Sequence, residues 1–402
     1  MFKTAIVKIY LYLKLAILKI LNFLLFNHAI RKDAYKKIIV LKSGGLGDFL
    51  MGVPALNLIK KTYGSADIVL VTNTTFSGMS IKKYWTKSAP ASDSTGENLE
   101  WLPFVEKKIN RFLRLQSLTR SEIARLRSEI GPMQNTAVVV LCYPGVPLSS
   151  LLKRIIFVRV LTGGNVSLFG VNKCADYSVL RRYQAISGLF KHKALGDLDS
   201  AGELCSTLGY EGNLTCDLYV ASAAKKKMSD FIECVARNGQ KLVLVAPIAA
   251  RAYKQWPITN YGKVMCQIAD RLRGDVFFIL IGTRNDHLAA NELLSHSPAG
   301  TRNLCGMLSL SEIAALLMES SLFLGNDGGM AHLAGALSVR SVVVFNSVEE
   351  HGLTTPMSEK SVVVRVDVAC SPCYNEVECP LGHRACVVNI PVEKVLSACA
   401  LI

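Results

Sequence analysis

A glycine-rich turn near the N-terminus contains an acid that could act as a base. Gly44, Gly45, Gly47 and Asp48 follow directly on an apolar run. Such a turn between a strand and a helix brings backbone N–H groups close to a ligand. Asp48 is then either a first-turn helix carboxylate or a general base that accepts a proton from a hydroxyl group. The spacing is not GxGxxG and no P-loop lysine follows, which argues against a dinucleotide site or an NTPase.

A second glycine-containing segment indicates an anion site in the C-terminal half. Asp327, Gly328 and Gly329 follow an apolar run and open a predicted helix that includes His332. The amides of Gly328 and Gly329 would point at an anion, with the helix dipole behind them. His332 lies one helical turn beyond Gly328, on the same face. It is either a packed residue or a support for the anion.

Two more polar residues follow predicted strands of the same half. Lys254 is either a solvated surface lysine or a cation that neutralises a diphosphate. Asp286 is either a helix N-terminal acid or a ligand for a ribose hydroxyl pair.

Four cysteines near the C-terminus form a C-x2-C-x5-C-x6-C pattern that indicates a structural zinc or an iron–sulfur centre. They are Cys370, Cys373, Cys379 and Cys386, and His383 could replace one of them as a ligand. The spacing is not that of a standard zinc ribbon, so disulfides and buried thiols are alternatives. The chain is long, so its twelve cysteines do not indicate a disulfide framework.

Three of these segments resemble motifs of glycosyltransferase family 9, the lipopolysaccharide heptosyltransferase family. The block 42–48, followed by 51–56, resembles the family's opening turn and helix. Lys254 before Trp256 and Pro257 resembles its phosphate-contacting lysine, and the block 325–334 resembles its most specific signature. The resemblance extends from about residue 37 to 390 and is weak between 74 and 215.

The resemblance implies an inverting glycosyltransferase. Asp48 would be the catalytic base, and Lys254, Asp286 and the block from Asp327 to His332 would bind the donor. Leu308 would lie in the loop beside the nucleotide base. The donor would be an ADP-heptose-like nucleotide sugar and the acceptor a lipopolysaccharide core or another lipid-linked glycan. No cofactor would be required.

The sequence departs from the family where hydroxyl residues usually stand, with Ala249 and Ala250 before the lysine and Gly328 in the signature. A non-catalytic nucleotide- or glycan-binding protein of the same fold is therefore an alternative, as is a related transferase with another donor sugar. A dehydrogenase is disfavoured by the absent GxGxxG.

Alternating apolar runs and helical stretches predict an α/β protein of the GT-B type, with two Rossmann-like doubly wound domains facing a central cleft. Strands are expected over 37–42, 67–72, 136–142, 241–246, 276–281, 322–325 and 341–345, and helices over 49–63, 258–271, 286–294, 310–318 and 330–337. We expect an acceptor domain over 31–220 and a nucleotide-sugar domain with a Cys-rich tail over 221–402. The basic stretch 221–227 is expected to be an exposed connection.

Residues 1–30 predict a basic amphipathic helix that lies on a membrane. Lys3, Lys8, Lys14, Lys19 and Asn22 share one arc of this helix, opposite Ile and Leu residues. Alternatives are a spanning helix, a signal peptide and a helix packed on the protein's own core. The net charge of +15 favours polyanionic partners, and no nucleic-acid-binding motif accompanies it. We therefore expect a cytoplasmic protein, peripheral on the inner face of the cytoplasmic membrane.

Overall fold

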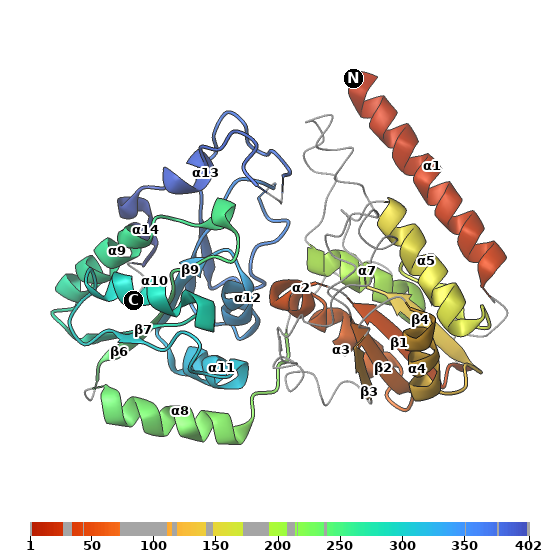
Figure 1. Cartoon of the computed structure of the whole chain (residues 1–402), viewed down its shortest axis with the longest axis horizontal. Helices are drawn as coiled ribbons and strands as arrows, with labels where there is room; N and C mark the ends of the chain where they lie inside the picture. Colours follow the sequence, from red (N-terminus) through yellow and green to blue (C-terminus); the bar gives the residue numbers. More distant parts are fainter. Residues whose placement is uncertain are drawn as a thin grey trace. The chain divides into compact units, whose positions relative to one another are not determined.

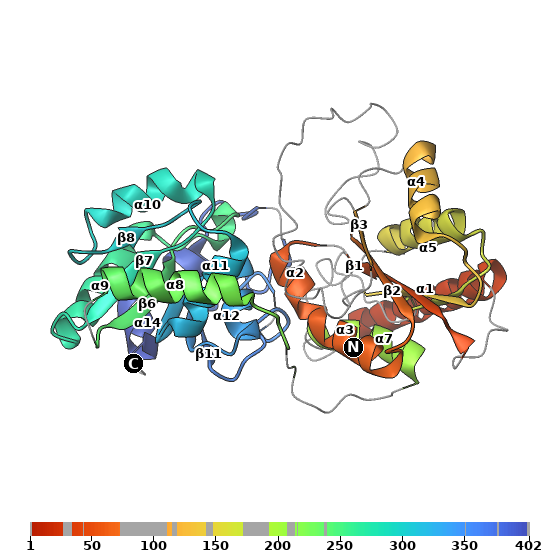
Figure 2. The same ribbon diagram turned by 90° about the horizontal axis from the view of Figure 1, so that it is seen from below.

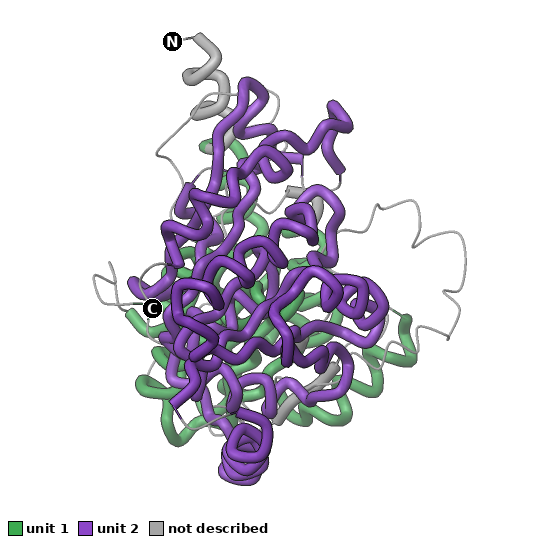
Figure 3. The backbone as a smooth tube through the Cα atoms, turned by 90° about the vertical axis from the view of Figure 1, so that its left-hand side faces the viewer, with its two compact units in different colours: residues 1–99, 105–214 green, residues 100–104, 215–402 purple. Residues whose placement is uncertain are grey.

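The computed structural model describes most of the 402 residues. The described residues are 2–26, 34–42, 44–72, 111–114, 119–141, 148–171, 193–206, 214, 216–236, 239–349, 351–375 and 378–399. They form two compact units, which Figure 3 colours separately: residues 1–99 with 105–214, and residues 100–104 with 215–402.

The first unit is built on a parallel sheet whose strand order is β3-β2-β1-β4-β5 in the described residues. These strands are β1 (Lys37–Lys42), β2 (Asp67–Thr72), β3 (Arg111–Arg114), β4 (Thr136–Val140) and β5 (Ser167–Phe169). The order reverses direction at β1, which is the topological switch point of a doubly wound sheet. The carboxyl end of β1 leads directly into the glycine turn.

Helices cover both faces of this sheet. They are α1 (Phe2–Leu25), α2 (Leu46–Met51), α3 (Val53–Thr62), α4 (Arg120–Ile130), α5 (Leu148–Thr162) and α7 (Lys193–Cys205). Ile39 and Leu41 share a core cluster with residues of α1, α4 and α5, and α3 packs on α7. Figure 2 shows α4 and α5 on one side of the sheet and α3 and α7 on the other.

The helix predicted over 49–63 is two helices instead of one. Gly52 ends α2 and begins α3, and Pro54 stands in the first turn of α3. A Cβ at Gly52 would lie 3.0 Å from Cε of Lys42, so the break brings backbone up to the Lys42 side chain.

The second unit contains a parallel sheet of order β11-β10-β9-β6-β7-β8 in the described residues. The strands are β6 (Lys241–Ala246), β7 (Val276–Leu280), β8 (Arg302–Asn303), β9 (Leu322–Asn326), β10 (Ser341–Val344) and β11 (Ser361–Val364). This order repeats the arrangement of the first unit, and its switch point lies between β6 and β9.

Helices of the second unit alternate with its strands from α8 to β10, and two more follow β11. They are α8 (Ser222–Val235), α9 (Ile258–Arg271), α10 (His287–Leu294), α11 (Leu310–Glu319), α12 (Gly329–Ala336), α13 (Ala385–Val388) and α14 (Val392–Cys399), with 3-10 turns at Ala252–Lys254 and Arg284–Asp286. The two Rossmann-like domains expected from the sequence are thus observed (Figure 1).

The basic stretch 221–227 is not a connection but the start of α8, so this prediction is wrong. Ala and Lys are strong helix formers, and Ala224 and Met228, one turn apart, are the residues of α8 that become buried. The lysines of this stretch are exposed, and Lys227 forms an ion pair with Glu312 of α11.

Helix α1 packs on the first unit, but with a different orientation from the one predicted. Leu18 and Phe26 belong to its core cluster. Lys14 is only 1% exposed, and Asn22 donates a hydrogen bond to the carbonyl oxygen of Leu168 at 3.0 Å. The prediction that these two polar residues face lipid is therefore wrong, because the protein itself buries them. The side chains of Lys3 and Lys8 lie outside the described residues. No helix among the described residues is long and apolar enough to span a membrane.

Candidate functional site

The first candidate group is the glycine turn after β1. Asp48 stands in the first turn of α2, where its Oδ2 accepts a hydrogen bond from the Gly45 N–H at 3.2 Å. Gly44 has φ +130°, and a Cβ there would lie 2.4 Å from the Asp48 Cβ. Glycine is therefore required at 44, both by the backbone conformation and by the carboxylate that lies over it. Asp48 fulfils the predicted helix N-terminal role, and it is half-buried.

A buried ion pair that the sequence analysis did not single out lies next to this turn. Lys42, the last residue of β1, donates from Nζ to Oδ2 of Asp197 on α7. The two side chains are 3% and 0% exposed. Burial raises the pKa of Asp197, while the Lys42 ammonium lowers it, and the nearby Asp48 carboxylate raises it further. The pair therefore lies within electrostatic reach of the candidate base.

The second unit places a comparable pair at its own switch point. Lys254 lies in the turn after β6, and its Nζ is 2.5 Å from Oδ2 of Asp327, at the end of β9. The Lys254 side chain is 28% exposed and that of Asp327 is 5% exposed. Burial lowers the pKa of Lys254, but the attraction of Asp327 outweighs it, so the pKa is raised above 10.5. Lys254 is thus a cation at neutral pH, with part of its side chain accessible.

Amide side chains fix the backbone on both sides of Lys254. Asn326 donates from Nδ2 to the carbonyl oxygen of Pro247 at 2.9 Å and accepts the Trp256 N–H at 3.1 Å. Gln255 accepts the Ala249 N–H at 2.7 Å and donates to the same Pro247 oxygen at 2.8 Å. Trp256 is fully buried, and its Nε1 donates a hydrogen bond to the Ile390 carbonyl oxygen at 3.0 Å. The loop is thereby held to β9 and to the core.

The segment 325–334, which resembles the family's signature, contains Asp327 and continues into α12. Gly328 is the N-cap of α12, so Gly329 begins that helix and its amides stand at the positive end of the helix dipole. His332 is buried, with its Nε2 3.9 Å from Oδ1 of Asp327, which is too long for a hydrogen bond. The structure thus brings Lys254, Asp327 and His332 together, and their role in binding an anion stays a prediction.

Asp286 and Leu308 lie at the ends of the neighbouring strands β7 and β8. Asp286 Oδ2 accepts hydrogen bonds from the Thr283 N–H at 2.7 Å and its hydroxyl at 2.8 Å, so it is a helix-capping acid, as in the alternative interpretation. The loop before Leu308 is joined to the β7 turn by the bond from the Gly306 N–H to the Gly282 oxygen, at 2.9 Å. Leu308 is half-buried in this loop. The structure leaves the predicted ribose contact untested.

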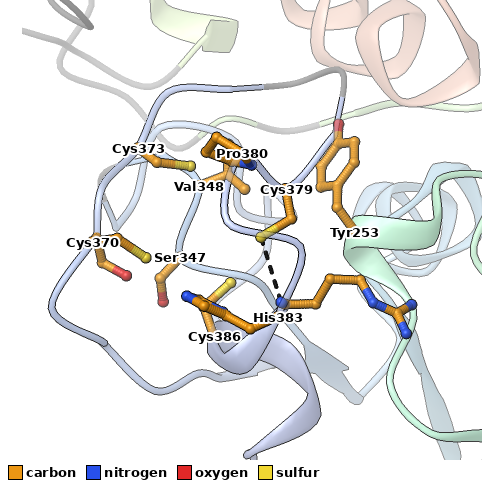
Figure 4. A pocket seen from close by; sticks show the side chains of 11 residues that line it. Tyr253, Ser347, Val348, Cys370, Cys373, Cys379, Pro380, His383 and Cys386 are labelled. Atoms are coloured by element: carbon orange, nitrogen blue, oxygen red, sulfur yellow. Dashed lines mark hydrogen bonds between the residues drawn. The ribbon is translucent and has the colours of Figure 1, made fainter.

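The four tail cysteines line one small cavity of the second unit, together with Ser347, His383 and others (Figure 4). Figure 4 shows their sulfur atoms turned toward a common space, and the Arg384 N–H donates to Sγ of Cys379 at 3.4 Å. Burial raises the pKa of the Cys386 thiol, and the other three cysteines raise it further. Among the described residues, however, no three His, Cys, Asp or Glu side chains are arranged to hold a metal ion. The donor set fits a metal, but the observed arrangement is not a coordination shell.

The sequence did not predict the side-chain contacts of Lys42, Asp197 and Asn326. Asn326 adjoins the recognised signature, and Lys42 was visible as a charged residue that ends an apolar strand. Asp197 had no such signal, because its partner is 155 residues away in the chain.

Comparison with known proteins supports the family resemblance in the C-terminal half of the chain. Residues 201–383 match the family model of glycosyltransferase family 9 (heptosyltransferase). Lipooligosaccharide heptosyltransferase 2 of Campylobacter jejuni is 26% identical over 165 residues, 40% of this chain and 51% of that protein. Lipopolysaccharide heptosyltransferase 2 of Escherichia coli is 28% identical over 150 residues, 36% of this chain and 41% of that protein. The match thus spans about half the length of these relatives, or less.

A solved structure agrees over a longer stretch. The E. coli ADP-heptose lps heptosyltransferase II has a TM-score of 0.59 at 18% identity, covering 91% of this chain and 98% of that one. At this identity the likeness shows the fold, and the predicted GT-B fold class is confirmed. Over residues 201–383 the chain matches the glycosyltransferase family 9 (heptosyltransferase) domain, as the motifs of this half of the chain indicated.

Proposed function

We propose that the protein is an inverting glycosyltransferase that moves a heptose from an ADP-heptose-like donor to a lipopolysaccharide core or another lipid-linked glycan. The observation that supports it most is the Lys254–Asp327 pair at the switch point of the second unit, beside the N-terminus of α12. This is where doubly wound sheets bind ligands. The curated relatives named above are heptosyltransferases, and the matched solved structure is named for ADP-heptose.

In this proposal the second unit stabilises the leaving group. As the bond from the anomeric carbon to the diphosphate breaks, negative charge accumulates on the phosphate oxygens. Lys254 supplies a fixed positive charge, since Asp327 keeps its pKa high. The amides of Gly328 and Gly329, at the start of α12, supply uncharged donors. These groups carry the charge of the diphosphate, so no step is assigned to a metal or a cofactor.

Asp48 would act on the acceptor. The acceptor hydroxyl oxygen forms the new bond to the anomeric carbon, its proton passes to the Asp48 carboxylate, and the nucleoside diphosphate departs with the bonding electrons. A single displacement inverts the anomeric configuration. The hydrogen bond from Gly45 holds one carboxylate oxygen and so fixes the side chain of the base.

The test is calorimetry of the purified protein with ADP, UDP, GDP, CDP and NAD. We expect one nucleoside diphosphate to be preferred, and Lys254→Ala to weaken its binding by one to two orders of magnitude, roughly the value of a charge-assisted contact. Lys225→Ala is the matched control, because this exposed lysine lies on α8. Absence of binding to every diphosphate would overturn the proposal.

A non-catalytic nucleotide- or glycan-binding protein is the second candidate. It is favoured by Ala249, Ala250 and Gly328, which lack the hydroxyl groups that the family usually has. Asp48→Asn separates the two candidates. In an enzyme this variant should lose turnover and keep donor binding, whereas a binding protein has no turnover to lose.

We also propose a structural zinc or iron–sulfur centre at Cys370, Cys373, Cys379 and Cys386, on the strength of the four thiols that line one cavity. Elemental analysis should find stoichiometric metal that Cys373→Ser removes. Cys234→Ser is the control, since this exposed cysteine lies on α8. A metal-free protein, purified without chelator, would contradict the proposal.

A further inference from the structure

Helix α1 presents an apolar face to solvent although it is packed on the protein. Its polar residues Lys14 and Asn22 point inward, so the large side chains on its other side have nowhere to pack within the first unit. Exposed large apolar residues of this face are Tyr12 (72%), Leu13 (60%), Ile17 (45%), Ile20 (57%), Phe23 (73%) and Leu24 (69%). A contiguous exposed patch of this kind marks an interaction surface.

Helix α5 of the same unit also exposes large apolar residues. It lies alongside α1 (Figure 1), and the two helices are in contact. Ile156 and Val160, one turn apart, are 58% and 45% exposed. At the C-terminal ends of the helices, a Cβ on Gly164 would lie 2.7 Å from the Leu25 oxygen, so the backbones approach closely there. The two helices are therefore packed against each other, and α1 is not a detached tether.

The positive charge of the two helices indicates which kind of partner their exposed residues would bind. Neither Phe2–Leu25 nor Leu148–Thr162 contains an Asp or Glu, and Lys19 and Arg159 are exposed among the apolar residues. A second copy of the same surface would bring like charges together, whereas anionic lipid headgroups would neutralise them. Lys19 and Arg159 have long apolar stems, which allow their charges to reach the headgroups while Ile and Phe side chains enter the acyl boundary.

We propose that α1 and α5 together form a lipid-docking surface that places the first unit on an anionic bilayer. The proposal deepens the lipid-linked acceptor of the proposed function, because it would bring the unit that contains Asp48 to the membrane in one orientation. The bilayer contact itself depends only on the exposed apolar and basic residues of the two helices.

The experiment is flotation of the full chain with vesicles of phosphatidylethanolamine and phosphatidylglycerol, compared with phosphatidylcholine alone. We expect binding to the anionic vesicles. The double variant Ile156→Ser with Val160→Ser should lower partitioning by about tenfold or more, since two apolar side chains no longer enter the bilayer. Ile20→Ser with Phe23→Ser should have at least the same effect. Leu288→Ser with Met318→Ser is the control, because these residues are also exposed, at 77% and 46%, but belong to the second unit.

The α5 variant decides between a two-helix surface and a lone amphipathic helix. Wild-type binding by that variant, or no binding of the parent chain to anionic vesicles, would overturn the proposal. A concentration-dependent dimer that the same substitutions dissociate would assign the surface to a second copy instead. Diphosphate binding, measured on the same variants, should be unchanged, so that a failure of the docking surface is distinguished from a failure of the transferase proposal.

Discussion

Each unit contains a lysine–aspartate pair near the switch point of its sheet, and the two pairs differ in exposure. In the first unit, Lys42 and Asp197 are 3% and 0% exposed. In the second unit, Lys254 is 28% exposed while Asp327 is 5% exposed. The sealed pair offers no route to a ligand, whereas the open pair has a cation that a ligand can reach. The same two residue types are thus suited to holding a scaffold in one unit and to binding a phosphate in the other.

The difference follows from where each lysine stands. Lys42 is the last residue of β1, so α7 and the backbone at Gly52 enclose it. Lys254 lies eight residues beyond the end of β6, in a loop that Asn326 and Gln255 hold in place. A lysine on a strand is enclosed by the helices that cover the sheet, whereas one on a loop at the carboxyl end of the sheet remains accessible.

The largest effect is expected from Lys42→Met. This variant leaves Asp197 buried without its cation, and breaking a buried pair from one side costs about 3–5 kcal/mol of unfolding free energy. Hydrogen exchange measured by mass spectrometry should show faster exchange in β1 and β4 and little change in β6. Equal protection of β1 in variant and parent would contradict the view that the pair holds this scaffold.

The same variant should also change the pH dependence of stability. Without Lys42, burial raises the folded pKa of Asp197, and only the smaller effect of Arg154 opposes it. A folded pKa above the unfolded value of about 4 means that the folded state holds the extra proton, so stability falls as the pH rises above about 4. Lys42→Met combined with Asp197→Leu removes both charges and should restore stability. A double variant as unstable as the single one would point to lost packing instead.

The next effect concerns the open pair and is expected from Asp327→Asn. Because Asp327 raises the pKa of Lys254 above 10.5, the pair is fully formed below that pH and is lost as the pH rises through the folded pKa. Diphosphate binding by the parent protein should therefore be nearly constant from pH 7 to 10. In the variant, burial lowers the pKa of Lys254, so binding should be weaker by roughly tenfold and should fall further as the pH rises.

Calorimetry at several pH values measures this effect. Asp275→Asn is a suitable control, since this exposed residue stands before the amino end of β7, away from the loops that follow the strands. If Asp327→Asn and the parent had the same pH profile, Asp327 would not set the charge of Lys254.

The strands were predictable from the sequence because parallel sheets bury both faces of each strand. The apolar runs at 37–42, 67–72 and 241–246 match β1, β2 and β6, and the helix predicted over 258–271 matches α9. The break at Gly52 was not predicted, since a glycine inside an apolar helical pattern is usually tolerated. The site residues that belong to local motifs, such as Lys254 and Asp327, were found.

What the sequence could not provide is the pairing of residues from distant segments. Lys42 and Asp197 share no motif, and only the fold brings α7 to the end of β1. The inward orientation of Lys14 has the same origin. Helical periodicity predicts a polar arc on α1, but whether that arc faces lipid or protein depends on the groups opposite it, such as the Leu168 oxygen that pairs with Asn22.

The smallest effect is expected at the open site, where Gly328→Ser would introduce a hydroxyl group that the family usually has. Gly328 has an extended backbone, with φ −178°, and the nearest atom to an added Cβ is the Asn326 oxygen at 4.0 Å, so a side chain fits without strain. One added hydrogen bond should improve diphosphate binding by about threefold. Gly328→Ala is the matched control, because it fills the same space without a hydroxyl group. A gain with Ser and none with Ala would indicate that the anion lies within reach of residue 328, whereas equal affinities would place it elsewhere along the first turn of α12.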